Sequence, residues 1–303
     1  MRLAFHFLIP ILMAGASTGC SGDPAKPDLV WGRKGVRDGD LARPRSCAIG
    51  RDDRLYIVDF TARIQVYDLD GKHLGLTWTT PDYRKGRPSG LGIDREGNLM
   101  VADSHYCCVR IYSPGGELLR TLDGPFGYIS DVVQDEEGNY YLAEFGEVQR
   151  ITKLDSNGKI LTRWGSQGTE PGQFSRPRAL ALGPDGLLYV ADACNHRIQV
   201  FDREGKLMRL WGTPGEAVGE LMYPYDLAFD ASGLLYIAEF GNHRVQKFTR
   251  EGQTLGTWGG PGREPGKLHC PWGLAVDRFG RVHILDTENH RVQRILFRDD
   301  ITP

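Results

Sequence analysis

The sequence predicts an all-β protein, a six-bladed β-propeller of four-stranded antiparallel blades. A unit of four short β-type runs recurs along the chain every 41 to 48 residues. Each copy carries an acidic residue at the same distance from its start. A segment like the fourth run of the unit stands alone near the N-terminus, whereas the last copy lacks its fourth run. A repeat of this length with four strands per copy is typical of propeller blades, not of helical solenoids.

The repeating unit is clearest between Pro177 and Gly212. Its runs are short and rich in apolar or alternating residues, as β-strands are, and glycine-containing turns join them. The runs cover residues 179–182, 187–191, 197–201 and 207–211. A sheet of this size cannot cover both of its own faces, so we expect each copy to pack against its neighbours.

The acidic residue fixes the register of the repeat. The six copies begin at Pro44, Pro88, Ile129, Pro177, Pro224 and Pro271. An acid follows 15 residues later in every copy, at Asp59, Asp103, Glu144, Asp192, Glu239 and Asp286. Composition alone does not preserve a spacing through six copies, so the register indicates a true structural repeat.

The two ends of the repeat region complement each other. Residues 28–32 read DLVWG, which matches the end of the fourth run in other copies, such as RLWG at Gly212. The sixth copy has three runs, and the chain then ends within a few residues. We therefore predict that residues 28–31 add the missing strand to the last blade and close the ring. The propeller then covers residues 28–297, and residues 298–303 form a tail.

Recurring residue types support each part of the blade. Small residues recur in the first run, where inner strands crowd near the axis, at Ala48, Gly92, Ala181, Ala228 and Ala275, with Val133 in the third copy. Glycines suited to tight turns follow the third run, at Gly71, Gly115, Gly158, Gly205 and Gly252. A tryptophan ends the fourth run in five blades, and we expect it to pack between blades; these residues are Trp31, Trp78, Trp164, Trp211 and Trp258.

Residues 1–20 have the pattern of an export signal. A basic start precedes the apolar stretch Leu3–Met13, and small residues follow. That stretch is too short to span a bilayer. Thr18-Gly19-Cys20 resembles the lipobox of bacterial lipoproteins, which implies lipidation of Cys20; the alternative is an ordinary secretory signal. Residues 21–27 then form a tether. The predicted location is the cell envelope, lipid-anchored to a bacterial membrane, or otherwise periplasmic or secreted.

A tripeptide signature connects the repeat to a known family. Asn-His-Arg occurs at 195–197, 242–244 and 289–291, after VAD, IAEF and ILD segments, and this resembles the NHL repeat over residues 28–297. The resemblance implies a six-bladed propeller. We expect the arginine to pair with the acid five residues before it, as Arg197 with Asp192, and the histidines to be structural. Blade 2 has Cys107-Cys108 in place of the His-Arg pair.

Composition limits the classes of function. The formal net charge is -2 and 25% of residues are charged, without a basic stripe. We therefore predict no nucleic-acid partner, although some relatives of this repeat bind RNA. The chain carries no RING-type cysteine pattern, so ligase activity is not expected.

The candidate site lies at the axial mouth, where each first strand begins. The residue after the repeat start lines this mouth and is variable: Arg45, Ser89, Ser130, Arg178, Tyr225 and Trp272. The next position adds Asp131 and Asp226. We predict a ligand-binding set of Arg45, Asp131, Arg178, Tyr225, Asp226 and Trp272, suited to a carboxylate, a peptide end or a sugar. The alternative is a mouth closed by its own pairs, Arg178 with Asp226 or Arg45 with Asp131.

Two functions fit this mouth. We prefer a non-catalytic cell-envelope module that holds a protein, peptide or glycan partner, without a cofactor and with membrane contact only through a lipid on Cys20. The alternative is a metal-dependent lyase or lactonase-like hydrolase. Arg45, Arg178 and Tyr225 resemble substrate-binding and catalytic residues of the peptidylglycine amidating lyase, which shares this repeat, but no mouth position here matches its zinc-binding histidines. Under this alternative, Asp131 and Asp226 would supply two oxygen ligands to a divalent cation.

The cysteines allow several arrangements. Cys47 lies in an apolar run and is predicted to be a buried thiol. Four others belong to loops on the mouth face: Cys107, Cys108, Cys194 and Cys270. Disulfides among them are compatible with export, and the sequence leaves their pairing open.

Overall fold

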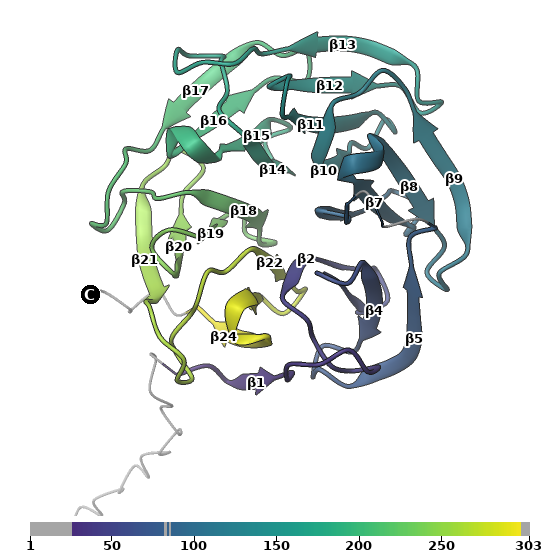
Figure 1. Cartoon of the computed structure of the whole chain (residues 1–303). Coiled ribbons are helices and arrows are strands. Elements are labelled where there is room, and N and C mark those ends of the chain that lie inside the picture. Colours follow the sequence, from purple (N-terminus) through teal and green to yellow (C-terminus); the bar gives the residue numbers. More distant parts are fainter. Residues whose placement is uncertain (1–25, 82–83, 85, 298–303) are drawn as a thin grey trace, which may run out of the picture.

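The computed structural model describes residues 26–81, 84 and 86–297. The predicted export signal with Cys20, most of the tether and the tail 298–303 lie outside these residues. The described chain forms a ring of sheets around a central axis, seen along that axis in Figure 1. No helix among the described residues has the length and apolar character needed to cross a membrane.

Blades 1 to 3 follow one another along the chain, each with its strands in sequence order. Blade 1 comprises β2 (Pro44–Ile49), β3 (Leu55–Asp59), β4 (Arg63–Tyr67) and β5 (His73–Thr79). Blade 2 comprises β6 (Gly90–Ile93), β7 (Leu99–Asp103), β8 (Cys108–Tyr112) and β9 (Leu118–Asp123), with a 3-10 turn η1 (Ser104–Tyr106). Blade 3 comprises β10 (Tyr128–Gln134), β11 (Tyr140–Phe145), β12 (Arg150–Leu154) and β13 (Ile160–Trp164).

Blades 4 to 6 complete the ring and confirm the predicted six-bladed, all-β architecture. Blade 4 comprises β14 (Pro177–Leu182), β15 (Leu188–Asp192), η2 (Ala193–Asn195), β16 (Arg197–Phe201) and β17 (Leu207–Trp211). Blade 5 comprises β18 (Pro224–Phe229), β19 (Leu235–Glu239), β20 (Arg244–Phe248) and β21 (Thr254–Gly259). Blade 6 comprises β22 (Gly273–Val276), β23 (Arg281–Asp286), η3 (Thr287–Asn289), β24 (Arg291–Leu296) and β1 (Leu29–Trp31).

Blade 6 joins the two ends of the repeat region. β1 pairs antiparallel with β24, with Val30 opposite Gln293 and Trp31 opposite Val292. Figure 1 shows β1 in purple beside β24 in yellow. The strand begins one residue later than predicted, yet the N–H of Asp28 still donates to the carbonyl of Arg294 at 3.0 Å. The Arg294 guanidinium also binds the Asp28 carboxylate at 2.6 Å, which adds a side-chain link to the backbone pairing.

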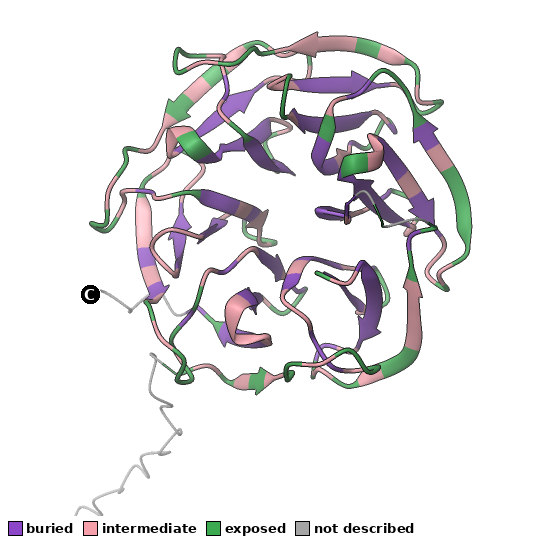
Figure 2. Ribbon diagram, viewed as in Figure 1, coloured by how far each residue is buried: buried purple, intermediate pink, exposed green. Residues whose placement is uncertain are grey.

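The core lies between neighbouring blades. The first three strands of each blade are mostly buried, whereas the fourth strands form an exposed rim (Figure 2). Four of the tryptophans that end a fourth strand pack on a hairpin glycine of the next blade: Trp31, Trp78, Trp164 and Trp211. A Cβ atom built on Gly252 would lie 2.5 Å from the Trp211 ring, so only glycine fits there. In blade 2 the glycine with positive φ is Gly116, one residue after the predicted Gly115.

The acid of each repeat forms a buried ion pair with an arginine. Asp192 binds Arg197 Nε at 2.8 Å, and the Arg197 guanidinium also donates to three carbonyls of the preceding loop, those of Thr169, Glu170 and Gln173. Equivalent pairs occur in the other five blades. Blade 2 keeps the interaction through Arg110, which donates to Asp103 at 2.8 Å although the expected position holds a cysteine. These pairs fix the loops that carry the mouth.

The signature histidines connect neighbouring blades. The Nδ1 atom of His196 accepts the N–H of Tyr223 at 3.0 Å, and His243 and His290 accept those of Cys270 and Arg43 in the same way. Each donor residue has positive φ and precedes a repeat proline. Burial lowers the pKa of all three histidines, which favours the neutral ring that such an acceptor role requires. This geometry supports the structural assignment of these residues.

Candidate functional site

Bulges at the start of the first strands direct side chains into the mouth. In blades 1, 3, 4 and 5 the pairing of the first two strands skips one residue, and the skipped residues are Arg45, Ser130, Arg178 and Tyr225. A β-bulge bends its strand and redirects the extra side chain. In four of the six blades, the variable mouth position is thus the bulged position of the repeat.

All six residues of the predicted site come together. Arg45, Asp131, Arg178, Tyr225, Asp226 and Trp272 line one small cavity on the axis, together with the serines of neighbouring blades. Its volume of about 20 Å³ holds roughly one water molecule. The mouth is therefore filled by its own side chains, and a larger ligand would contact it from the outer side.

The arginines stack on aromatic rings and form no pairs with the two aspartates. The Arg45 guanidinium carbon lies 4.9 Å from the Trp272 ring centre, and that of Arg178 lies 5.4 Å from the Tyr225 ring centre. No ion pair between these arginines and Asp131 or Asp226 occurs in the described chain, so the alternative of a mouth closed by Arg–Asp pairs does not describe this structure.

The two aspartates bind backbone groups of the next blade. Asp131 accepts the N–H of Leu180 at 2.8 Å, and Asp226 accepts that of Leu274 at 2.9 Å. Because of these hydrogen bonds, both carboxylates lie between their own blade and the next one. The two aspartates stand one residue after the bulged position of their own blades, and they bind the following blade instead of the arginines.

Several buried donors at the mouth have no acceptor within the described chain. These atoms are Arg45 Nε, Arg178 Nε and Trp272 Nε1. Arg178 is only 6% exposed and makes a single long hydrogen bond, 3.5 Å to the carbonyl of Ser89. Buried donors are nearly always paired in folded proteins. Three unpaired donors from residues that line one cavity indicate a site where a ligand supplies the hydrogen-bond acceptor.

The mouth is locally basic. Burial and the nearby Arg178, Arg87, Arg43 and Arg176 lower the pKa of Arg45, and burial lowers that of Arg178. Arg43 forms an ion pair with Glu288. Within the described part of the chain, no carboxylate lies within ion-pair distance of the other four arginines. A chain with net charge -2 therefore concentrates positive charge at this site.

Behind the mouth, the axial channel widens towards the opposite face. This part has a volume of about 250 Å³ and is lined mainly by apolar residues such as Ile93, Val133 and Phe229. Asp131 and Asp226 border both compartments. Burial and, to a lesser extent, the nearby Asp226 raise the pKa of Asp131 to about 8. Burial raises the pKa of Asp226 to about 7.

These raised pKa values predict that stability falls as pH increases. The folded state holds protons that the unfolded state releases above roughly pH 4. Between about pH 4 and 8, each group therefore lowers the free energy of unfolding by up to about 1.4 kcal/mol per pH unit. Asp131→Asn removes one titrating group, so its urea midpoint should fall less than that of the wild type between pH 5 and 8. If the urea midpoints of the two proteins fell equally between pH 5 and 8, the raised pKa of Asp131 would be contradicted.

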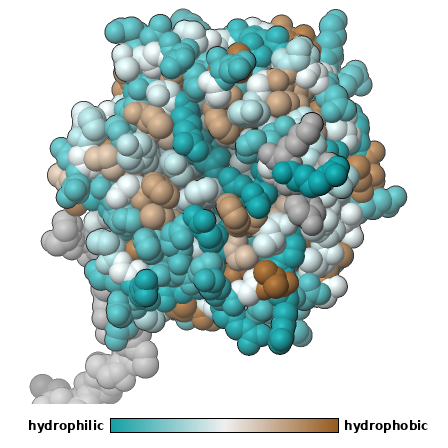
Figure 3. All heavy atoms as spheres, viewed as in Figure 1, coloured by the Kyte–Doolittle hydropathy of each residue, from teal (hydrophilic) through white to brown (hydrophobic). Residues whose placement is uncertain are grey.

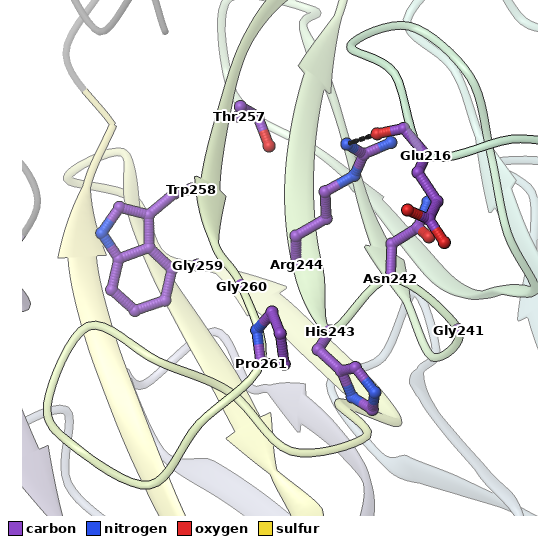
Figure 4. Close-up of a pocket in the computed structure, with 10 residues that line it drawn as sticks. All are labelled: Glu216, Gly241, Asn242, His243, Arg244, Thr257, Trp258, Gly259, Gly260 and Pro261. Atoms are coloured by element: carbon purple, nitrogen blue, oxygen red, sulfur yellow. Dashed lines mark hydrogen bonds between the residues drawn. The ribbon is translucent and has the colours of Figure 1, made fainter.

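A larger cavity than that of the mouth lies at the rim of blade 5 (Figure 4). It has a volume of about 600 Å³ between the loops on either side of the Asn242-His243-Arg244 signature. The polar groups of the signature already hold these loops: Arg244 donates to the carbonyl of Glu216 at 2.7 Å, and Asn242 donates to that of Gly215 at 2.9 Å. We therefore prefer the mouth, where buried donors lack partners.

Residues 26–81, 84 and 86–297 contain no group of three or more His, Cys, Asp or Glu side chains arranged to hold a metal ion. All five described cysteines are free thiols: Cys47, Cys107, Cys108, Cys194 and Cys270. Cys47 is buried, as the sequence predicted.

Sequence reasoning missed an alternation around the mouth. Odd-numbered blades place a phenylalanine directly after the repeat acid, whereas even-numbered blades have a small residue there; the phenylalanines are Phe60, Phe145 and Phe240. In odd-numbered blades, the residue after the mouth position also accepts a backbone N–H of the next blade. In blades 3 and 5 this residue is Asp131 or Asp226, and in blade 1 it is Ser46, whose hydroxyl accepts the N–H of Leu91 at 3.0 Å. Comparing alternate copies, rather than all six together, would have revealed this pattern.

The fold and site thus define a closed six-bladed β-propeller with an arginine-rich axial mouth. The sequence profile of the NHL repeat matches residues 174–201, 221–248 and 268–295, which lie in blades 4 to 6. The chain thus carries three NHL repeats within a six-bladed β-propeller.

Curated relatives share parts of the chain. Peptidyl-glycine alpha-amidating monooxygenase A of Xenopus laevis is 33% identical over 216 residues, which cover 62% of this chain and 21% of that protein. NHL repeat-containing protein 3 of Mus musculus is 26% identical over 162 residues, 47% of this chain and 46% of that protein. The matches span about a fifth of the first relative and about half of the second.

Solved structures share the fold. A streptogramin B lyase has a TM-score of 0.63 and 16% identity, covering 88% of this chain and 86% of that one. A gluconolactonase from Xanthomonas campestris has a TM-score of 0.65 and 16% identity, covering 84% and 86%. At such low identity, the likeness concerns the fold alone.

Proposed function

We propose that this protein is a non-catalytic binding module that holds a protein, peptide or glycan partner through an anionic group at the mouth face. The observation that carries this proposal is the set of buried donors without acceptors, Arg45 Nε, Arg178 Nε and Trp272 Nε1. A carboxylate accepts hydrogen bonds from guanidinium groups and offsets part of their positive charge. The aromatic faces of Tyr225 and Trp272 hold those groups in place beforehand.

The similarity to the amidating enzyme is compatible with an anionic ligand. Its name specifies a peptidyl-glycine, whose end is a carboxylate. The described residues favour binding over a metal-dependent reaction, because Asp131 and Asp226 hold backbone N–H groups and no third ligand accompanies them. We therefore propose no catalytic residue and no cofactor.

We also propose that the module works at the cell envelope, anchored by a lipid on Cys20. The export pattern of residues 1–20 and the lipobox-like Thr18-Gly19-Cys20 support this location. On Triton X-114 extraction of the producing bacterium, the protein should enter the detergent phase, and Cys20→Ser should move it to the aqueous phase. If the wild-type protein were found in the aqueous phase, the proposed lipid anchor would be wrong.

Arrays of peptides and glycans test the binding proposal. We expect the ligands retained by the full-length protein to share a carboxylate or another anionic group. Arg178→Gln should reduce their signal at least ten-fold, since an ion pair with a buried guanidinium contributes roughly 1.5–3 kcal/mol. Arg250→Gln, which changes an arginine outside the mouth-lining set, serves as the matched control. Retention of mainly neutral ligands, or signals unchanged by Arg178→Gln, would refute the mouth site.

A further inference from the structure

We propose that the partner is an acidic oligosaccharide, a chain of uronate residues that extends from the mouth over an exposed aromatic row beside it. This inference rests on the proposed function and names its ligand. The row, called here the outer row, consists of His105, Tyr128, Phe145 and Arg176. It crosses blades 2, 3 and 4 on the face that carries the mouth.

The outer row is continuous. The rings of His105 and Tyr128 lie 5.0 Å apart, those of Tyr128 and Phe145 lie 5.7 Å apart, and the Arg176 guanidinium lies 5.7 Å from the Phe145 ring centre. Tyr128 is 42% exposed, so one part of its ring is open to a ligand. Figure 3 shows the same face, where hydrophilic residues surround isolated hydrophobic ones. The row thus offers flat apolar surface beside positive charge.

The outer row adjoins the mouth. Tyr128 and Arg176 each stand two residues before a mouth residue, Ser130 and Arg178. Arg176 lies near enough to affect the pKa of Arg45 and Arg178. A ligand whose anionic group occupies the mouth would therefore place its next units over Arg176 and the aromatic rings.

The distribution of positive charge at the mouth favours a ligand that carries several anionic groups. Arg45, Arg87, Arg176 and Arg178 have no ion-pair partner in the described chain. Arg87 also stacks on Phe60, with its guanidinium carbon 4.1 Å from the ring centre. A ligand with one carboxylate would leave most of this charge unbalanced, whereas a uronate chain carries one carboxylate per sugar unit.

The backbone at the mouth favours a sugar over a peptide. A bound peptide usually pairs its main chain with free N–H and C=O groups of its receptor. Here the N–H groups beside the repeat starts are occupied: Arg176 donates to Gln149, Tyr223 to His196, and Phe240 to the carbonyl of Tyr223. The available groups are guanidinium donors and aromatic faces. The negative face of an aromatic ring attracts the C–H groups of a pyranose ring, and arginine binds its carboxylate.

Calorimetry and NMR titration of the full-length protein at low ionic strength test this inference. The probes are tetragalacturonate, the galacturonate monomer, neutral cellotetraose and hexaglutamate. We expect tetragalacturonate to bind at least ten-fold more tightly than the monomer. Tyr128→Ala and Arg176→Gln should each weaken the tetramer at least five-fold and leave the monomer unchanged, because the monomer contacts only the outer side of the mouth and does not reach the outer row.

Phe279→Ala is the matched control. Phe279 is an exposed ring beside Arg278 and Arg281 in the first hairpin of blade 6, at the opposite ends of the strands from the mouth, so its loss should have no effect. Equal binding of cellotetraose, tighter binding of hexaglutamate, or no binding of either uronate would each overturn the oligosaccharide inference. The binding proposal would still hold if another anionic ligand required Arg178. It fails if the retained ligands are mainly neutral, or if Arg178→Gln changes the binding of no ligand.

Discussion

Asp192→Ala should destabilise the protein by about 3–5 kcal/mol, the cost of removing one partner of a buried ion pair. Asp192 is fully buried and accepts hydrogen bonds from Arg197, Asn195 and Gln199, and from the N–H of Ser175. Its loss leaves the Arg197 guanidinium unpaired in the interior. Urea unfolding followed by tryptophan fluorescence gives the change in the free energy of unfolding.

The control for this substitution is Asp38→Ala, at an exposed loop position. An exposed substitution of this kind usually changes stability by less than about 0.5 kcal/mol. Similar losses in the two variants would show that the repeat acid is not the anchor of its loop. A loss that also appears in Glu239→Ala, the equivalent change in blade 5, would show that each blade depends on its own acid.

Trp31→Ala should open the ring. β1 is only three residues long, and Trp31 is its largest side chain. The Trp31 ring centre lies 4.7 Å from that of Tyr67, with the rings tilted, and the indole packs on Gly71. Replacing a packed tryptophan by alanine costs about 3–5 kcal/mol, less where the ring is partly exposed, as it is here. We expect a clear fall in melting temperature and loss of amide protection in β1 and along its partner β24.

Trp211→Ala provides the comparison, because Trp211 packs on Gly252 in the same way but lies in a blade whose strands are continuous in the chain. Its effect on hydrogen exchange should remain within blades 4 and 5. If Trp31→Ala left the protection of β24 unchanged, β1 would not be required to hold the ring together.

Much of the architecture could be predicted because the repeat fixes the register of every copy. The acid at a constant spacing locates the end of each second strand, and from it the positions of the mouth residues follow. The details that failed are local. Arg110 replaces the missing arginine of blade 2 from two residues further along, and Gly116 takes the turn predicted for Gly115. In the first case the ion pair is kept, and in the second the positive φ of the turn is kept, although a different residue provides each of them.

The sequence alone determined the number of blades, the matching ends of the repeat and the six residues that meet at the mouth, because strand periodicity and turn spacing are local properties of the chain. Only the tertiary structure decided how those six residues interact. The bulge directs Arg45 and Arg178 onto aromatic rings of other blades, while Asp131 and Asp226 bind backbone N–H groups of the blade that follows. Such contacts join segments about 50 or more residues apart, and their geometry depends on how whole blades pack.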